Sequence, residues 1–341
     1  MKHIDLLLPF GLPHKELAAD LLRTITTPAL ATLIARANSR PTEEFDEFSR
    51  ALPHEHWLAR QFGMAGHMVA HGSPPVAIAT MQALGLQAEP GTWFMLHPVH
   101  IHIARDHLVL TDIHQLALAE QESRALFDVA KSLFDEAGKT LLYGDARTWF
   151  VRADDWHALK TSTPDAACGH NIDIWMPKGD GDRAWRKLQN DVQMHWHSHT
   201  INAEREMRGV KPVNSLWLWG GTPTALETAS GRYAKVCNPS GWIAALAHLA
   251  QEQSHAGGGT DLIVCDTLIE PALAGDWSEW LARFHLLEND WFSPTLDSLK
   301  AGKIDRIGLI ATHNSRLAEF AVTRHSLRKF WIKPSLKKLA P

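Results

Sequence analysis

The fold is decided by a short apolar stretch near the amino terminus, residues 3–13, HIDLLLPFGLP, in which a buried strand (His3–Leu8) leads into a turn rich in proline and glycine. Two further buried strands are predicted at residues 262–265 and 306–311. Predicted helices separate the strands in the first ~90 and the last ~125 residues, an alternation that is typical of a parallel sheet flanked by helices. The sequence therefore predicts an α/β core.

The middle of the chain has a different pattern. Between Thr92 and Thr111 short apolar strands follow one another, with Arg105-Asp106 as a turn, and a hairpin is predicted around Gly144-Asp145. This strand-rich stretch interrupts the alternation, which favours one interrupted core over two domains in tandem. We expect a discontinuous core, residues 1–91 plus 214–341, and an inserted α+β domain, residues 92–213.

Composition limits the class of protein. The chain has 341 residues, of which 45% are hydrophobic and 21% are charged, and its formal net charge is −4. These values indicate neither a disordered chain nor a nucleic-acid-binding protein. No stretch approaches ~18 uncharged apolar residues, and the three cysteines lack a CxxC spacing. We expect a soluble cytoplasmic protein with reduced thiols, no membrane contact and no nucleic-acid partner.

Histidine is unusually frequent, with 21 residues, which raises the hypothesis of a metal site. His195 and His199 lie four residues apart at the end of a predicted helix, and His100 and His102 share one face of a predicted strand. Either pair would need a third ligand and an orienting second shell. For the first pair the alternative is a polar helix end, where histidines interact favourably with the helix dipole.

Two arginines suggest a place for an anion. Arg205 and Arg208 lie three residues apart, so on a helical turn they project together, as a bidentate contact with phosphate or carboxylate requires. The alternative is a solvated surface on which Glu204 pairs with Arg208.

Ser73 is the candidate nucleophile, because it precedes a predicted helix whose positive end would activate a hydroxyl. Pro74 and Pro75 remove two backbone N–H donors from such a site, so a helix-capping serine is the alternative. The chain contains no G-x-S-x-G, P-loop or G-x-G-x-x-G motif, which disfavours a serine hydrolase, an NTPase and a Rossmann protein.

The carboxyl-terminal segment after Glu319 carries six Lys and Arg residues and no acid, with Phe330 and Trp331 among them. Such a segment contacts nucleic acid or anionic lipid in some proteins, but it more often forms a solvated face.

A longer pattern points to a family. Residues 199–221, HTINAEREMRGVKPVNSLWLWGG, resemble the H-x-x-N-x-x-R-x-x-x-G-x-x-P-x-N segment of the archaeal-type cofactor-independent phosphoglycerate mutases, which precedes a hydrophobic strand and glycines. Residues 27–35, TPALATLIA, resemble a stretch of the alkaline-phosphatase superfamily. The whole chain is similar to the RpfE-type bacterial "regulatory protein" branch of the mutase-like family. The residues that the resemblance assigns to anion or substrate binding are His199, Asn202, Arg205, Arg208 and Asn214.

The resemblance implies an alkaline-phosphatase-like core with two divalent metals (Mn, Zn or Mg), held by aspartates and histidines at the carboxyl ends of the core strands, and Ser73 as nucleophile. This chain departs from that pattern, because Pro9-Phe10-Gly11 replaces an Asp-Gly and Thr312-His313 replaces an Asp-His. The residues that remain as metal ligands are Glu270, Asp276, His313 and His325, which make at best one incomplete site.

We therefore expect a degenerate phosphoglycerate-mutase-like protein, catalytically inactive or altered, that acts in a bacterial cytoplasm as a regulatory or phosphometabolite-binding protein. No cofactor is expected, and the expected partners are a small phosphorylated metabolite or another protein. Two alternatives stay open. One is an active metal-dependent phosphoglycerate mutase or phosphatase with Ser73 as nucleophile, and the other is a histidine-rich metal-binding protein.

Overall fold

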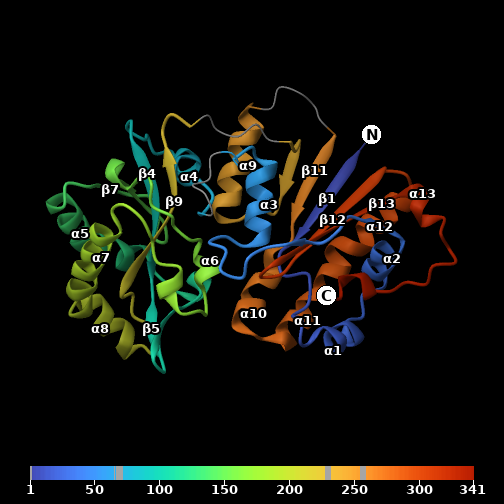
Figure 1. Cartoon of the computed structure of the whole chain (residues 1–341), viewed down its shortest axis with the longest axis horizontal. Helices are drawn as coiled ribbons and strands as arrows, with labels where there is room; N and C mark the ends of the chain where they lie inside the picture. The colour runs from blue at the N-terminus through green and yellow to red at the C-terminus, as the bar shows by residue number, and fades with distance from the viewer. Residues whose placement is uncertain (1, 65, 67–71, 227–231, 254–258) are drawn as a thin grey trace. The chain divides into compact units, whose positions relative to one another are not determined.

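The computed structural model describes residues 2–64, 66, 72–226, 232–253 and 259–341. The chain forms two compact units (Figure 1). The first consists of Met1–Glu47, Leu52–Phe62 and Ser230–Pro341, and the second of Phe48–Ala51 and Gly63–Ala229. None of the helices within the described ranges combines the length and the hydrophobicity that a membrane crossing requires.

The first unit is built on a seven-stranded sheet. In sheet order its strands are β10 (Lys235–Cys237), β11 (Thr260–Val264), β1 (His3–Leu8), β12 (Arg306–Thr312), β13 (Arg316–Thr323) and β2 (Asn38–Ser39), while β3 (Glu43–Glu44) also pairs with β13. β1 runs parallel to β11 and β12, and β13 is antiparallel to β12. Leu6, Leu7 and Leu8 are all buried, so both faces of the central strand need cover.

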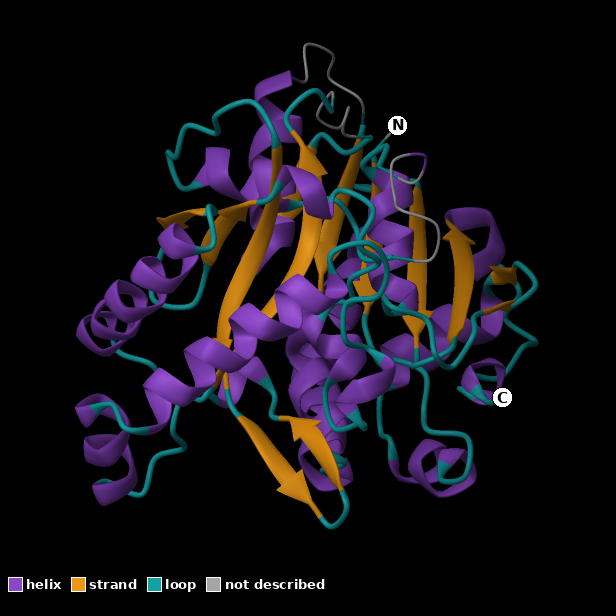
Figure 2. Ribbon diagram, turned by 60° about the vertical axis from the view of Figure 1, so that its left-hand side comes forward, coloured by secondary structure: helices purple, strands orange, loops and turns teal. Residues whose placement is uncertain are grey.

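Helices supply that cover (Figure 2). The first unit contains α1 (Ala18–Thr24), α2 (Pro28–Arg36), α3 (Pro53–Gln61), α9 (Gly241–Gln253), α10 (Ile269–Ala274), α11 (Trp277–Leu287), α12 (Ser293–Lys300) and α13 (Arg324–Leu327). At the start of α2, the backbone N–H groups of Ala29 and Leu30 donate to the buried Glu288 carboxylate at 2.6 and 3.2 Å. The predicted α/β core with a mostly parallel sheet flanked by helices is confirmed.

The second unit contains an antiparallel four-stranded sheet in the order β7-β8-β4-β9. Its strands are β4 (Thr92–Val99), β7 (Thr140–Tyr143), β8 (Trp149–Arg152) and β9 (Ser215–Pro223), with a separate ribbon of β5 (Ile101–Ala104) and β6 (His107–Leu110). Its helices are α4 (Ala77–Ala83), α5 (Glu120–Glu136), α6 (Pro164–Ala167), α7 (Asp182–His197) and α8 (Thr200–Met207). The predicted hairpin around Gly144-Asp145 is the β7–β8 pair.

β9 belongs to this antiparallel sheet. Residues 215–219 lie in the range predicted for the core, 214–341, but β9 pairs with β4 from Ser215 opposite Val99 to Pro223 opposite Thr92, with one irregularity between Trp219 and Thr222. A run of buried residues indicates a strand without indicating its sheet, which explains the difference. The predicted insertion, residues 92–213, lies within the second unit, which also includes the described residues 72–91 and 214–226.

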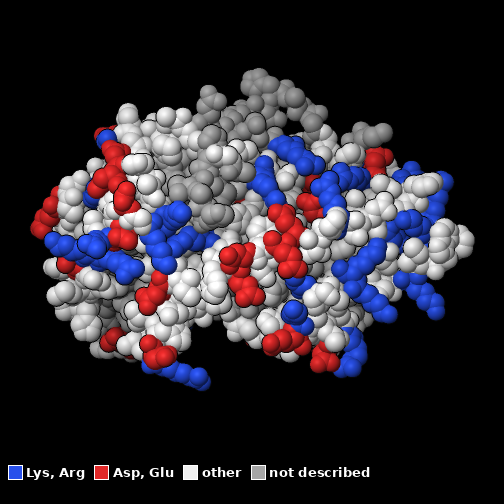
Figure 3. Space-filling view, in the orientation of Figure 1, with Lys and Arg blue, Asp and Glu red and all other residues white. Residues whose placement is uncertain are grey.

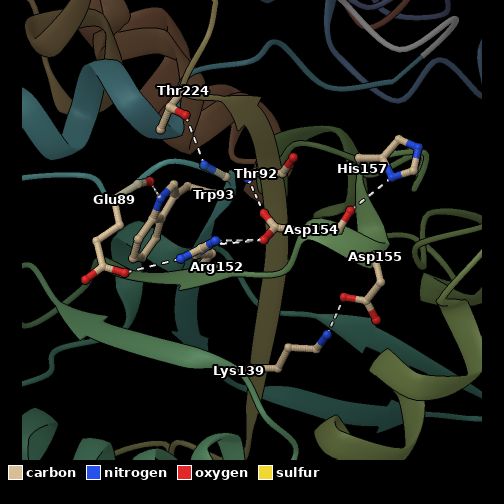
Figure 4. Close-up of polar contacts among 10 residues, drawn as sticks. Glu89, Thr92, Trp93, Lys139, Arg152, Asp154, Asp155, His157 and Thr224 are labelled. Atoms are coloured by element: carbon tan, nitrogen blue, oxygen red, sulfur yellow. Dashed lines mark hydrogen bonds and ion pairs between the residues drawn. The ribbon is translucent and has the colours of Figure 1, made fainter.

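A polar network holds the start of β4 (Figure 4). The Asp154 carboxylate accepts a hydrogen bond of 2.7 Å from the Thr92 N–H, which is the main cause of its lowered pKa. Arg152, at the end of β8, donates to Asp154 at 3.0 Å and to Glu89 at 3.2 Å. These contacts fix the register of the paired strands beside the buried ring of Trp93, whose N–H donates to the Glu89 carbonyl.

Candidate functional site

Open α/β sheets bind ligands at the carboxyl ends of their strands, which in the first unit are the ends of β1 and β12. Here the first unit places a group of aromatic and imidazole rings. The Phe10 ring lies 6.3 Å from the His313 ring and 6.1 Å from the His54 ring, and His14 lies 5.4 Å from His313, measured between ring centroids. His14 also contacts Trp277 at 5.9 Å. We call these five residues the Phe10 cluster.

Phe10 has an unusual backbone at the end of β1. Its φ of 55° lies in the left-handed region, which costs a residue with a side chain about 1–2 kcal/mol. The Phe10 N–H donates to Thr312 Oγ1 at 3.3 Å, and its carbonyl accepts from Trp280 Nε1 at 3.0 Å. Phe10 is 3% exposed. Burial and both hydrogen bonds therefore hold the strained conformation in place.

Burial keeps two histidines of the Phe10 cluster, His54 and His313, neutral at pH 7. Burial lowers the pKa of His54 to about 3, with a smaller contribution from His56. Burial also lowers the pKa of His313 to about 4, and the charges of Arg316 and His14 add to this effect. The cluster contains no carboxylate, so its five side chains carry no negative charge with which to attract a divalent cation.

Two imidazole nitrogens of the cluster lack partners. Nδ1 of His14 and Nδ1 of His54 are buried and make no hydrogen bond to the described residues. A buried polar atom without a partner costs about 1–3 kcal/mol, so such atoms often mark a binding site. The cluster can therefore offer hydrogen bonds to an uncharged ligand between apolar rings.

The predicted metal ligands have other contacts. Glu270 accepts a hydrogen bond from Arg283 Nη2 at 3.1 Å. The Asp276 side chain caps α11 through the Glu279 N–H at 3.0 Å. His313 lies in the Phe10 cluster, while His325 is exposed.

Within the described ranges no three His, Cys, Asp or Glu side chains form a group that could hold a metal ion. The structure therefore does not bring the four predicted ligands together. A centre of two divalent cations needs several carboxylates for charge balance, and this donor set does not fit it.

The two predicted anion-binding arginines bind a carboxylate of their own chain. Arg205 is 1% exposed, and its Nη1 donates to Glu122 Oε2 at 2.5 Å while its Nε donates to the Lys211 carbonyl at 2.9 Å. Arg208 donates to the other carboxylate oxygen. Burial by itself raises the pKa of Glu122, but the Ala119 N–H and the two arginines outweigh it, and the pKa is lowered.

The two predicted asparagines hold the backbone. Asn202 Nδ2 donates to the carbonyls of Trp196 and Val213 at 2.9 and 2.8 Å, and its Oδ1 accepts from the Val213 N–H at 2.8 Å. Asn214 makes a matching pair of bonds with Ile101, at 2.8 Å to the N–H and 2.7 Å to the carbonyl. The Asn202 amide joins α8 to α7 and to the loop before β9, and the Asn214 amide joins that loop to β5.

The predicted histidine pairs do not assemble a site in the described ranges. α7 ends at His197, and His199 accepts from the Ile201 N–H at 3.2 Å as the cap of the next helix, so His195 and His199 do not share one helix. His100 and His102 stack with ring centroids 5.9 Å apart. Burial is the main cause of the lowered pKa of His100.

Ser73 is buried in the second unit. Its Oγ accepts from the Gly220 N–H at 3.0 Å and shares a hydrogen bond of 2.8 Å with Thr161 Oγ1. It does not cap a helix, because α4 begins at Ala77 with Val76 as its cap. The hydroxyl has both of its partners inside this unit.

Four members of the Phe10 cluster were not predicted from the sequence as members of a site: Phe10, His14, His54 and Trp277. The available signal was position, since residues 9–13 directly follow the first buried strand. His54 carried no comparable signal, because it comes to the cluster from the start of α3.

Comparison with known proteins gives a partial likeness. No family model matches the chain. Over 127 residues, 36% of this chain, it is 24% identical to 2,3-bisphosphoglycerate-independent phosphoglycerate mutase 2 of Methanothermobacter thermautotrophicus. The match spans 32% of the length of that relative.

Two solved structures also match. The cofactor-independent phosphoglycerate mutase from Thermoplasma acidophilum gives a TM-score of 0.41 at 16% identity, covering 100% of this chain and 94% of that one. The PH0037 protein from Pyrococcus horikoshii gives 0.48 at 11% identity, covering 94% and 87%. The curated relative is thus a 2,3-bisphosphoglycerate-independent phosphoglycerate mutase, to which this chain is similar over 36% of its length.

Proposed function

We propose that this chain is a phosphoglycerate-mutase-like protein of the RpfE-type regulatory branch, in which ligand binding has replaced phosphoryl transfer, and that it acts in the bacterial cytoplasm. One observation carries the proposal. At the carboxyl ends of β1 and β12, where the resemblance implies the carboxylates of a two-metal centre, lies the Phe10 cluster, which has no carboxylate and in which His54 and His313 are neutral.

The replacement of carboxylates by the Phe10 cluster matters because it changes the charge of the site. Two divalent cations and a phosphoryl group need anionic ligands that fix the metals and balance their charge. Phe10 and two neutral imidazoles provide none, while Glu270 and Asp276 are engaged by Arg283 and by α11. A neutral, partly apolar site instead suits an uncharged portion of a ligand.

The unpartnered imidazole nitrogens of the Phe10 cluster support a binding role. Nδ1 of His14 and Nδ1 of His54 are buried without a partner among the described residues, so a ligand that supplies a hydrogen bond to either would recover that lost energy. A ligand that binds the folded chain raises its free energy of unfolding, which is a change that a regulatory protein can use without catalysing a reaction.

The test is an assay of purified full chain with 3-phosphoglycerate and with a generic phosphatase substrate, with Mn²⁺, Zn²⁺ or Mg²⁺ added, together with analysis of bound metal. We expect wild type and Ser73→Ala to give the same background rate. A stoichiometric metal together with a rate that Ser73→Ala abolishes would overturn the proposal and establish an active mutase or phosphatase. Metal lost on changing His195 and His199 without any turnover would favour the histidine-rich metal-binding protein.

A further inference from the structure

A basic pocket lies in the first unit, beside the end of β13. It has a volume of about 480 Å³. Its lining residues are Lys300, Arg324, His325, Leu327 and Arg328. Three of these five are Lys or Arg and one is His, in a chain whose formal net charge is −4.

Two elements bring these cations together. Lys300 is the last residue of α12, and Arg324 is the first of α13. Arg328 follows α13 with helical φ and ψ of −66° and −9°, so Arg324 and Arg328 lie one helical turn apart on the same face. The Thr323 side chain caps this turn by accepting from the Ser326 N–H, which stabilises the backbone that carries both arginines.

The cations of the pocket are largely unpaired. Lys300 is the exception, with an exposed ion pair to Asp297 at 2.9 Å. The side chains of Arg324, His325 and Arg328 make no hydrogen bond or ion pair with the residues that the structure describes. Arg283 in the same unit, in contrast, pairs with both Glu270 and Glu279. Unpaired positive charges that lie close together repel one another, and a bound anion lowers that repulsion energy.

The carboxyl-terminal segment that carries Arg324 and Arg328 does not supply that anion. Residues 320–341 contain six Lys and Arg and no Asp or Glu. Figure 3 shows basic side chains gathered on the side of the first unit where Figure 1 places α12 and α13. Positive neighbours also disfavour a divalent cation at His325, so the electrostatics of this pocket select negative ligands.

We propose that the basic pocket binds the phosphate group of an anionic ligand, with Arg324 and Arg328 as a pair of guanidinium donors and Lys300 as a third cation. Guanidinium groups match phosphate oxygens with two parallel hydrogen bonds, and an ammonium group adds a point charge. The proposal extends the regulatory role above by naming a ligand class. It is tested by binding, so it and the proposed loss of turnover can fail separately.

The phosphate can belong to a free metabolite or to a lipid headgroup. Phe330 and Trp331 follow the pocket directly and are 81% and 69% exposed, with their rings in edge contact at 5.3 Å. Exposed aromatic rings beside basic residues are also found at membrane interfaces. The experiment therefore has one arm for each source.

The first arm is calorimetric titration of the full chain with pyrophosphate. We expect saturable binding that Arg324→Gln/Arg328→Gln weakens by about tenfold or more. The matched control is Arg183→Gln/Arg186→Gln, which removes the same charge from exposed residues of α7 and should leave binding unchanged. Thermal unfolding of each variant establishes that it is folded.

A third variant keeps the charge and changes the geometry. Gly302 has a φ of +72°, and a Cβ there would come within 2.6 Å of Arg324 Nη1, so Gly302→Ala should displace the guanidinium and weaken binding while the net charge is unchanged. The proposal is overturned if the pocket variants and the α7 control weaken binding equally, because the effect is then one of net charge. It is also overturned if neither pyrophosphate nor vesicles bind.

The second arm is sedimentation with phosphatidylglycerol vesicles, with phosphatidylcholine vesicles as reference. Binding that Arg324→Gln/Arg328→Gln abolishes and that Phe330→Ser/Trp331→Ser weakens identifies a lipid headgroup as the source. Pyrophosphate binding without vesicle binding identifies a free phosphorylated ligand. Vesicle binding that the pocket variant leaves intact contradicts the proposal.

Discussion

Arg205 and Glu122 form a buried ion pair inside the second unit, with 2.5 Å between Arg205 Nη1 and Glu122 Oε2. Arg205 belongs to α8 and Glu122 to α5, so the pair joins two helices that are 83 residues apart in sequence at these positions. An external anion at Arg205 would have to displace a carboxylate that the fold itself supplies. The arginine that the sequence assigns to a ligand therefore has a structural partner.

The first prediction follows from that partner. Glu122→Gln removes the charge that compensates Arg205, and leaving one member of a buried pair unpaired costs about 3–5 kcal/mol in the free energy of unfolding. Urea unfolding measures the loss. Glu120→Gln is the control, because its ion pair with Arg124 is exposed and should change stability by less than about 1 kcal/mol. Equal effects of the two substitutions would contradict the buried pair.

The second prediction concerns the free energy of unfolding at acid pH. The pKa of Glu122 is lower in the folded chain than its ordinary value of 4.5, so the unfolded chain binds more protons in this range. The stabilisation that the ionised Glu122 contributes is complete above its ordinary pKa of 4.5. It is lost as the pH falls through the pKa of Glu122 in the folded chain. The difference in unfolding free energy between wild type and Glu122→Gln should therefore narrow below about pH 4.5. A difference that stays constant from pH 6 to pH 3 would rule out this linkage.

The third prediction concerns His54, a buried histidine of the Phe10 cluster. Burial lowers the pKa of His54 to about 3, so between that pH and 6.5 the unfolded chain carries a proton there that the folded chain lacks. Stability should rise with pH through this window, with His54 contributing a slope of about 1.4 kcal/mol per pH unit. His54→Gln should remove that slope from the measured pH dependence of urea unfolding.

The control for His54 is Leu58→Ala in the same helix, because Leu58 is buried and does not titrate. It should lower stability by about 2–5 kcal/mol at every pH and leave the slope unchanged. If His54→Gln behaves in the same way as Leu58→Ala, then His54 is not held neutral by the fold.

The fold could be predicted where periodicity and burial agree. The apolar run of β1 and the alternation of strands with helices predicted the parallel sheet, because a strand that is buried on both faces is mostly apolar and shows no regular alternation of polar positions. The place of β9 could not be predicted. Its residues are as apolar as those of β1, and pairing with β4 depends on contacts between residues more than 100 positions apart.

The site could be predicted only in part. The three-residue spacing predicted that Arg205 and Arg208 reach one anion, and they do, but the anion is Glu122 of the same chain. A local spacing reports which side chains point together and not what they meet. The Phe10 cluster depends likewise on residues brought from the ends of β1 and β12, from α3 and from α11. The two strand ends carried a signal in the sequence, but His54 and Trp277 did not.

The last prediction separates a structural role of Asn202 from a ligand-binding one. Asn202→Asp keeps the shape of the side chain but replaces the Nδ2 donor by an oxygen that faces the carbonyls of Trp196 and Val213. Two lost hydrogen bonds and the new repulsion should lower the free energy of unfolding by about 3 kcal/mol or more. Asn190→Asp is the control, since Asn190 is exposed on α7 and should change stability by about 0.5 kcal/mol or less.

Hydrogen exchange locates the effect. Because Asn202 ties the segment before β9 to the end of α7, the amide of Val213, which donates to Asn202 Oδ1, should exchange faster in Asn202→Asp than in wild type. The amides of β1 in the first unit should be protected as in wild type under the same conditions. A variant with wild-type stability and wild-type exchange at Val213 would show that Asn202 is free to serve a ligand, as the mutase-like segment implies.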